Sequence, residues 1–353
     1  MKGRVIVLDH VAGREAAALV VDGRLEDLRI EPGADAPPRV GAIFRGRADR
    51  PMKGQGGVFV ALPEGMTGFL RNPGGVAAGK PLLVQVSGTA EPGKAVPLST
   101  RLLFKTRLAI LTPGAPGLNI SRRIRDEDRR GELDRLTRAA MANAAPDLGM
   151  ILRSAAETAD DDEIAEELSA LRELAEAVLA DTEGAPELLL DDAGPHDLAW
   201  RDWTDPAPDD VAEGPGSLAA HDVLDMIDAV LNPEVALAGG GTMLIEPTRA
   251  LIAVDVNTGA DASPGAGLKA NIAAARELPR QLRLRGLGGQ VTVDFAPMPK
   301  RDRHVLEQVL RAAFKGEASE TSLAGWTPLG LYEIQRKRDR LALTRCLAPG
   351  DLE

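Results

Sequence analysis

The sequence has little of several things, and each shortage excludes a class of protein. A single cysteine, Cys346, among 353 residues excludes a disulfide framework and a cysteine-cluster zinc site within one chain. Aromatic residues make up only 3% of the chain, so Leu, Val, Ile and Ala must fill the core. No stretch reaches the roughly 18 uninterrupted apolar residues of a membrane span, and the N-terminus lacks a signal-peptide core. We therefore expect a cytoplasmic protein without a membrane partner.

Negative charge is abundant but confined to one block of the chain. The formal net charge is −11, from 53 acidic and 42 basic residues. Residues 156–232 hold 23 of the acidic residues and only 2 basic ones, whereas 1–155 carry a net charge of +8 and 233–353 of +2. A polyanion is therefore not excluded as a partner, because the basic parts can hold it while the acidic block faces away.

The length and the turn residues predict several folding units. At roughly 100–200 residues per domain, the chain should contain two or three. Alternating residues predict a hairpin in the first 36 residues with its turn at Asp22-Gly23, and short strands over 40–100 predict a small barrel. Helices are expected at 126–145, 160–180, 217–231, 267–286 and 305–314. Residues 181–215 are expected to form a linker, in which PELLLDD could be one strand. The apolar stripe of the helix at 160–180 is expected to be Ile164, Leu168, Leu171, Leu174 and Val178.

Two aspartates stand at the ends of predicted strands in the last third of the chain. Asp255 in AVDVN and Asp294 in TVDF flank a helix, which is the pattern of a βαβ unit with parallel strands. The carboxyl ends of such strands share one sheet edge, so the two carboxylates should converge, with Asn257 on the same side. These oxygen donors suit Mg²⁺ or Mn²⁺. The pattern alone favours a plainer interpretation, in which Asp255 is a strand-end cap or turn residue and Asp294 is a surface carboxylate.

Longer motifs add a resemblance to a known family. LIAVDVNTG, ELPRQLRLRGLGGQVTVDF and GLYEIQRKR resemble the catalytic core of the ribonuclease E/G family of bacterial endoribonucleases. IFRGRA, VFVALPEGMTGFL and GKAVPLST resemble its S1 RNA-binding domain, and ISRRI and GMILRSA resemble its 5′-sensor. The resemblance covers most of the chain and is strongest over 236–340.

The resemblance implies a particular fold. It is an α/β multidomain protein in which an RNase H-like segment carries an inserted S1 (OB-type) barrel and a 5′-sensor, followed by a DNase I-like catalytic α/β domain. The implied boundaries are 1–36 with 181–235 for the RNase H-like subdomain, 37–102 for the S1-like barrel, 103–180 for the 5′-sensor-like region, 236–345 for the catalytic domain and 346–353 for a tail.

The resemblance also implies an activity and a set of site residues. The activity is Mg²⁺-dependent cleavage of single-stranded RNA in RNA processing, including rRNA processing, and decay, which leaves 5′-phosphate and 3′-hydroxyl ends. Asp255 and Asp294 would bind the metal, and Asn257 would orient the attack. The remaining implied residues are Phe59, Phe69, Lys94, Arg122 and Arg123 for RNA binding, and Arg153 with Ser154 for a 5′-monophosphate. By themselves, Phe59 and Phe69 also fit core residues, the arginines of SRRIR fit a solvated patch, and Arg153 fits a surface cation.

The chain also departs from the family pattern. The CPxC pair that shares zinc between subunits is missing, as is the small dimerisation domain, so no zinc link is expected and a monomer or a dimer is possible. VDFAPM has Pro297 where the family has a second acid. Two other hypotheses for the function stay open. In the first, the chain is a non-catalytic or weakly active RNA-binding relative, and in the second it is a metal-dependent phosphatase or DNase.

Overall fold

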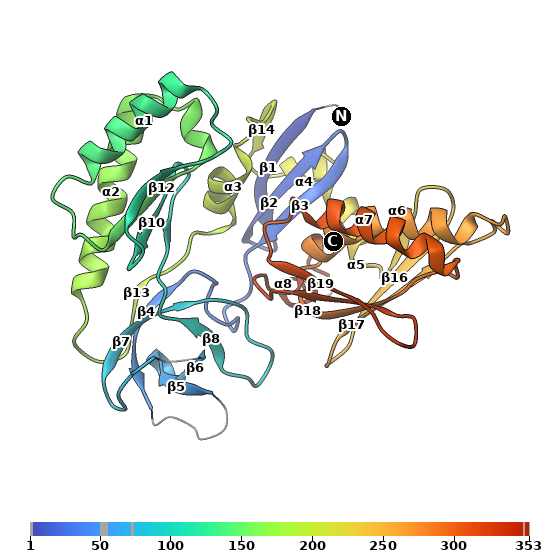
Figure 1. Ribbon diagram of the computed structural model, residues 1–353, viewed down its shortest axis with the longest axis horizontal. Coiled ribbons are helices and arrows are strands. Elements are labelled where there is room, and N and C mark those ends of the chain that lie inside the picture. The colour runs from blue at the N-terminus through green and yellow to red at the C-terminus, as the bar shows by residue number, and fades with distance from the viewer. Residues whose placement is uncertain (1–2, 50–55, 72–73, 349, 353) are drawn as a thin grey trace. The chain divides into compact units, whose positions relative to one another are not determined.

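The structure is a computed structural model in which residues 3–49, 56–71, 74–348 and 350–352 are described, and every candidate site residue lies in these ranges. The expected RNase H-like subdomain, barrel and tail also include residues outside these ranges. The chain forms two compact units, Met1–Ala34 with Asp209–Glu353, and Asp35–Pro208. Figure 1 shows the elements along the chain, which is a mixed α/β protein with several sheets. Of the helices in the described ranges, none combines the length and apolarity needed to cross a bilayer.

The N-terminal strands form a small sheet of their own. β1 (Arg4–Val11), β2 (Arg14–Val21) and β3 (Arg24–Ile30) are antiparallel, and β14 (Asp210–Glu213) pairs in parallel with β1. The turn predicted at Asp22-Gly23 is confirmed, since both residues have positive φ, as a tight hairpin turn requires. α4 (Ser217–Ala220), α5 (Val223–Leu231) and α8 (Leu343–Cys346) pack into the same core. The helix expected at 217–231 is thus divided, with Asp222 at φ 56° between its halves.

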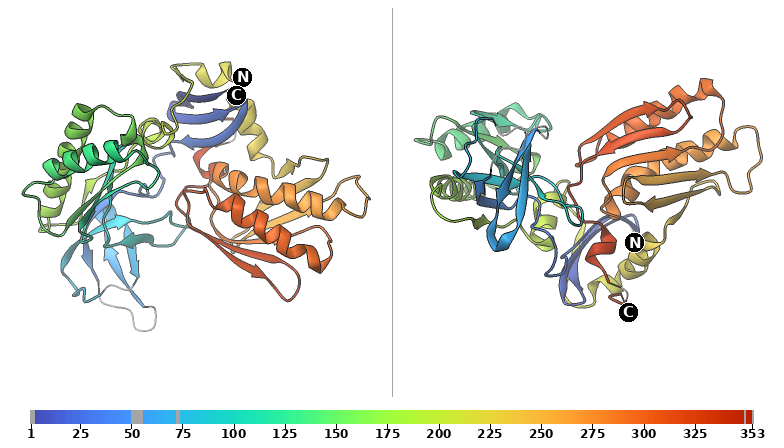
Figure 2. Two further views of the ribbon diagram at one scale, coloured as in Figure 1. Left: turned by 45° about the horizontal axis from the view of Figure 1, so that its top comes forward. Right: turned by 90° about the horizontal axis from the view of Figure 1, so that it is seen from below.

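The largest sheet of the same unit has the strand order β15-β16-β17-β18-β20-β19. Its strands are β15 (Glu234–Ala236), β16 (Thr242–Pro247), β17 (Ile252–Asn257), β18 (Gly289–Asp294), β19 (Thr321–Trp326) and β20 (Tyr332–Arg336). The predicted βαβ unit is confirmed: β17 and β18 are parallel and α6 (Ala266–Leu284) joins them. α7 (Arg303–Phe314) follows the short η3 (Lys300–Asp302). Both long helices pack against one face of the sheet (Figure 2).

The second unit begins with a closed, OB-like barrel. Its strands are β4 (Ile43–Ala48), β5 (Gly57–Ala61), β6 (Thr67–Arg71), β7 (Pro81–Val86) and β8 (Val96–Ser99), with η1 (Pro63–Gly65) between β5 and β6. Pairing of β4 with β7 closes the cylinder. β13 (Glu187–Leu190) adds to β4 on the outside, so the strand considered within PELLLDD exists.

The remainder of this unit is a sheet covered by two helices. β9 (Phe104–Lys105), β10 (Ala109–Pro113), β11 (Gly117–Ile120) and β12 (Leu148–Leu152) pair in the order β11-β12-β10-β9. α1 (Glu127–Ala140) and α2 (Asp161–Ala180) supply apolar side chains to its core, and η2 (Ser154–Glu157) follows β12.

One member of the expected α2 stripe is wrong. Leu174 is 42% exposed, and Ala175 is buried in its place. The buried positions 164, 168, 171, 175 and 178 alternate steps of four and three residues. Position 174 lies about 100° around the helix from 175, which turns its side chain to solvent.

The expected linker at 181–215 is more ordered than its composition suggests. Besides β13 it contains α3 (Pro195–Trp203), with Ala199 and Trp203 buried, and β14 at its end. Of the segment 181–235 that the resemblance assigns to the RNase H-like subdomain, β13 pairs with the barrel and β14 pairs with β1.

Candidate active site

The two strand-end aspartates lie side by side. In the parallel pairing of β17 and β18, Asp255 is the direct partner of Asp294, and neighbouring strands are about 4.8 Å apart. Both side chains are exposed, on the sheet face opposite α6 and α7. Asn257 is exposed on the same face, and its amide donates a 2.7 Å hydrogen bond to Oδ2 of Asp255. The sequence-predicted convergence of these side chains is therefore present in the structure.

The alternation of β17 and β18 explains why these carboxylates point outward. Ile252, Val254 and Val256 are buried toward the helices. Because successive side chains in a strand point to opposite faces, the residues between them face solvent. The burial of the apolar set therefore fixes the orientation of the acidic one, since a register slip of one residue would bury both aspartates.

The backbone after Asp294 is held by a buried asparagine. Asn271 of α6 is fully buried; its amide donates to the carbonyl of Ala296 and its Oδ1 accepts from the Ala296 N–H, both at 2.9 Å. Gly267, one turn earlier, makes room for the same segment, since a Cβ there would lie 2.1 Å from the carbonyl oxygen of Pro297. α6 therefore fixes the direction in which the chain leaves the site.

The carboxylate pair is not neutralised by any basic side chain that the structure describes. Across the described ranges, neither Asp255 nor Asp294 pairs with a Lys, Arg or His side chain. Nor do three or more His, Cys, Asp or Glu side chains gather anywhere in those ranges as a ready metal cage. Two adjacent carboxylates and an amide thus form an open, negatively charged set of oxygen donors.

The two phenylalanines expected to bind RNA form a pair on the barrel. Phe59 of β5 is the direct cross-strand partner of Phe69 of β6, with ring centroids 5.3 Å apart. Both rings are half-buried, while Val58 and Val60 fill the barrel core. The ring of Phe69 lies against Gly57, where a Cβ would be only 2.4 Å from it. The pair thus presents aromatic surface outside the barrel core.

Among the basic residues expected around the barrel and sensor, Lys94, Arg123 and Arg153 contact acidic side chains. The side chain of Lys94 is 70% exposed, and its ammonium group pairs with Glu91. Arg122 is exposed, and Arg123 lies 3.2 Å from Oδ2 of Asp205. The guanidinium group of Arg153 donates to the Thr106 and Arg201 carbonyls at 2.7 and 3.1 Å and to Asp202 at 3.1 Å. Ser154 donates to Asp205.

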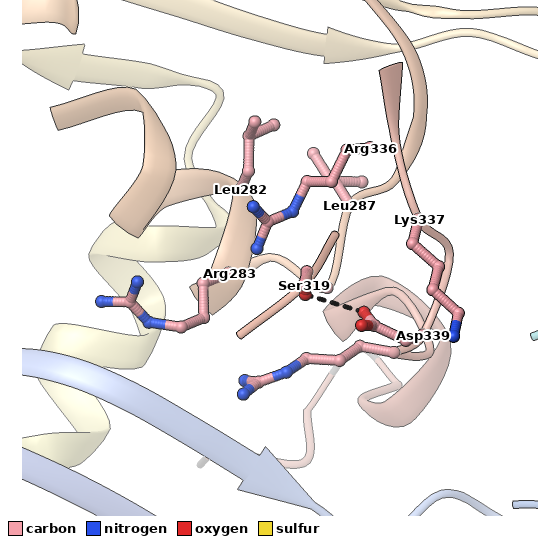
Figure 3. Close-up of a pocket in the computed structure, with 9 residues that line it drawn as sticks. Leu282, Arg283, Leu287, Ser319, Arg336, Lys337 and Asp339 are labelled. Carbon is pink, nitrogen blue, oxygen red and sulfur yellow. Dashed lines mark hydrogen bonds between the residues drawn. The ribbon is translucent and has the colours of Figure 1, made fainter. Parts of the chain in front are cut away.

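A separate hollow lies at the end of β20, and Figure 3 shows its lining. The lining residues are Leu282, Arg283, Gly286, Leu287, Ser319, Arg336, Lys337, Asp339 and Arg340, with a 2.8 Å hydrogen bond from Ser319 to Asp339. Arg336 is buried and pairs with Glu317 at 2.8 Å, and Arg283 pairs with the same carboxylate. These paired charges make the hollow a structural junction, and no sequence-predicted site residue lines it.

Next to this hollow is a strongly perturbed carboxyl group, that of Asp27. Burial alone would raise the pKa of Asp27, but the charge and hydrogen bonds of Arg340, helped by Arg29 and Arg283, lower it to about 2. Arg340 donates to both oxygens of Asp27, at 2.5 and 3.0 Å. This pair joins β3 to the chain that follows β20.

Sequence reasoning missed several residues around the sites. Asn271 is a polar residue within the apolar face of α6, and that break in the pattern is the signal that could have identified it. Asp202 and Asp205 offered no such signal, because they belong to a long acidic block and their partners are distant in sequence.

An OB-like barrel, together with an α/β sheet that exposes a carboxylate pair, is typical of proteins that process nucleic acids. The Ribonuclease E/G family pattern matches residues 104–213 and 212–339, and the chain belongs to this family. At the level of the family, this means an endoribonuclease of RNA processing and decay, with RNA as the substrate.

Named relatives agree with this membership. Ribonuclease G of Salmonella typhimurium is 28% identical over 403 residues, which cover 97% of this chain and 81% of that protein. Ribonuclease E of Nostoc sp. is 28% identical, over 96% of this chain and 56% of its own length. Ribonuclease G of Haemophilus influenzae is 26% identical, over 94% of this chain and 78% of its own length.

Proposed function

We propose that this chain is an Mg²⁺-dependent endoribonuclease that cuts single-stranded RNA and leaves 5′-phosphate and 3′-hydroxyl ends. The observation that carries the proposal is the register of β17 and β18, which brings Asp255 and Asp294 together on an exposed sheet face. In this proposal the six-stranded sheet is a DNase I-like domain, the N-terminal sheet is RNase H-like, and the barrel is an S1 domain.

The donors around the pair fit a hard divalent cation. They are carboxylate and amide oxygens without nitrogen or sulfur ligands, which suits Mg²⁺ or Mn²⁺. Two like charges on adjacent strands repel each other, and across the described residues no basic side chain offsets them. Held by Asp255 and Asp294, Mg²⁺ would activate a water molecule and stabilise charge on the phosphate.

The chain's own side chains supply orientation. The hydrogen bond from Asn257 to Asp255 fixes one carboxylate oxygen, so Asn257 positions that carboxylate and lies where it can orient the scissile phosphate. Asn271 contributes from α6, because it hydrogen-bonds the Ala296 backbone two residues beyond Asp294. Both restrict the freedom of the carboxylate pair before substrate binds.

The barrel supplies RNA binding in this proposal. Phe59 and Phe69 present adjacent, half-buried rings, and stacking of a base on such a ring contributes about 1–3 kcal/mol. Stacking does not require a particular base, which suits single-stranded RNA. Lys94, 70% exposed, can exchange its pairing with Glu91 for a phosphate contact.

The test is cleavage of an end-labelled single-stranded RNA in Mg²⁺. Asp255→Asn and Asp294→Asn should each slow cleavage by at least ~100-fold, more than the loss typical of residues that only support a metal ligand. Their RNA affinity should stay near that of the unmutated chain, because stacking involves the barrel. Glu246→Gln is the control, since Glu246 is exposed on the neighbouring strand β16.

Two results would contradict the proposal. Cleavage by both aspartate variants at the unmutated rate would place the site elsewhere. RNA binding by the unmutated chain without cleavage in Mg²⁺ or Mn²⁺ would identify a non-catalytic RNA-binding relative.

A further inference from the structure

Two carboxylates from one short segment occupy the donors of a cluster that is expected to hold a phosphate. Asp202 is the penultimate residue of α3, and Asp205 lies three residues further on. Asp202 accepts from the guanidinium group of Arg153 at 3.1 Å. Asp205 accepts from the hydroxyl of Ser154 and pairs with Arg123 at 3.2 Å. Arg123 follows β11, whereas Arg153 and Ser154 directly follow β12. Both acceptors belong to the segment 202–205.

The cluster is held in place by further contacts, and its arginines are paired with carboxylates. Asp202 also binds Arg201, which contacts it through Nε and Nη2, both at 3.2 Å. Burial would lower the pKa of Arg201, but Asp202 and Asp192 raise it above its ordinary value. Arg153 is further fixed by the carbonyls of Thr106 and Arg201. An incoming anion therefore meets donors that already bind two carboxylates, those of Asp202 and Asp205.

We propose that Asp202 and Asp205 are specificity-determining residues that occupy the Arg123–Arg153–Ser154 cluster in place of a terminal phosphate and so suppress discrimination between RNA 5′ ends. This inference rests on the proposed function for its substrate, RNA with a 5′-monophosphate. A guanidinium group and a hydroxyl bind a carboxylate and a phosphate with the same donors. A phosphomonoester carries about −1.5 to −2 charges, and it must displace the carboxylates to bind.

Displacement is sterically feasible. The side chains of Arg153 and Asp202 are 28% and 25% exposed, and those of Arg123 and Asp205 are 67% and 29% exposed. The donors can therefore be reached from solvent without unfolding the segment. The balance between the internal carboxylates and an external phosphate then sets the 5′-end preference.

The variants Asp205→Asn and Asp202→Asn/Asp205→Asn remove the negative charge and keep the side-chain volume. Asp197→Asn is the matched control, because Asp197 lies on the exposed face of the same helix α3. Each protein is tested with RNA bearing a 5′-monophosphate or a 5′-hydroxyl. Cleavage rates are measured in Mg²⁺, and affinities are measured separately in EDTA, so that a failure of cleavage does not obscure the result.

For the unmutated chain and Asp197→Asn, the cleavage rates and affinities of the two RNAs should differ by no more than about threefold. The double variant should prefer the 5′-monophosphate RNA by about tenfold or more, which is the effect of one charge-assisted contact. Asp205→Asn should show part of this gain, and Arg153→Ala added to the double variant should remove it. An unchanged preference in both readouts, or an equal gain in Asp197→Asn, would overturn the proposal. Absence of cleavage with a preference in EDTA would count against the nuclease activity and still support this inference.

Discussion

The carboxylate pair of the six-stranded sheet and the arginine cluster at 123–154 differ in how their charges are satisfied. Asp255 and Asp294 are exposed neighbours without a basic partner in the part of the chain that the structure describes. Arg123 and Arg153, in contrast, each contact a carboxylate of the segment 202–205. The first arrangement attracts a cation as it stands, whereas the second must release an internal anion before it binds another. A charge pattern in the sequence does not distinguish these two states.

The contrast also separates residues that hold the fold from residues that are available for chemistry. Pairing stabilises buried charges, as between Asp27 and Arg340. Neighbouring like charges without a basic partner lower stability slightly, and a functional site commonly carries such a cost. Stability measurements can therefore test the comparison independently of activity.

The largest effect on stability is expected from Arg340→Ala. It leaves the buried carboxylate of Asp27 without its main partner, and breaking a buried pair in this way costs about 3 kcal/mol. Urea unfolding monitored by circular dichroism would measure the loss. Arg301→Ala is the control, since Arg301 is 85% exposed and its contact with Asp302 is 3.8 Å long. Equal stability of the two variants would show that the Asp27–Arg340 pair does not support the fold.

The Asp27 pair also predicts a pH dependence. Its folded-state pKa of about 2 lies below the ordinary value of 3.8. The ionised form therefore stabilises the fold above pH 3.8, by about 2 kcal/mol, and this contribution is lost as the pH falls toward 2. Unfolding free energies measured between pH 5 and pH 2 should show this loss. Asp27→Asn should lack that part of the pH dependence, and an identical profile in the variant would contradict the assignment.

Asn271→Ala is expected to affect both the fold and the site. It removes two hydrogen bonds to the Ala296 backbone and leaves a buried N–H and carbonyl unsatisfied, at a cost of about 1–3 kcal/mol. Cleavage should fall at saturating RNA because Asp294 is held less firmly, while RNA affinity should not change. Loss of stability with an unchanged turnover rate would show that the clamp serves the fold alone.

The smallest expected effect is a gain in stability. Asp255→Asn in EDTA should raise the unfolding free energy by about 0.5 kcal/mol, because it removes repulsion between like charges on adjacent strands. Asp294→Asn should behave similarly, although both variants lose activity. Thermal melting would detect the shift, and a loss of more than about 1 kcal/mol in either variant would mean that these carboxylates have structural partners.

The sequence was most informative where a short pattern determines geometry. The βαβ order around 255–294 predicted the parallel register that brings Asp255 to Asp294, because few chain topologies satisfy it. The turn at Asp22-Gly23 was equally predictable, since both residues tolerate positive φ. Long, ordered motifs identified the family for the same reason.

Contacts between distant segments could not be read from the sequence. The pairing of Arg153 with Asp202 joins residues 49 positions apart, and the acidic block offered many equivalent partners. α3 was hidden within a stretch rich in Pro, Gly and Asp, where local propensity favours a linker but the burial of Ala199 and Trp203 decides for a helix. Leu174 was misplaced because a step of three residues and a step of four both fit a helical stripe.

Binding of Mn²⁺, followed by electron paramagnetic resonance in the absence of RNA, tests the central claim most directly. The claim is that Asp255 and Asp294, unlike the paired charges elsewhere, form a metal site. The unmutated chain and Glu246→Gln should bind the ion with equal affinity, and Asp294→Asn should bind it at least ~10-fold more weakly. Equal Mn²⁺ binding by Asp294→Asn and the unmutated chain would contradict the claim.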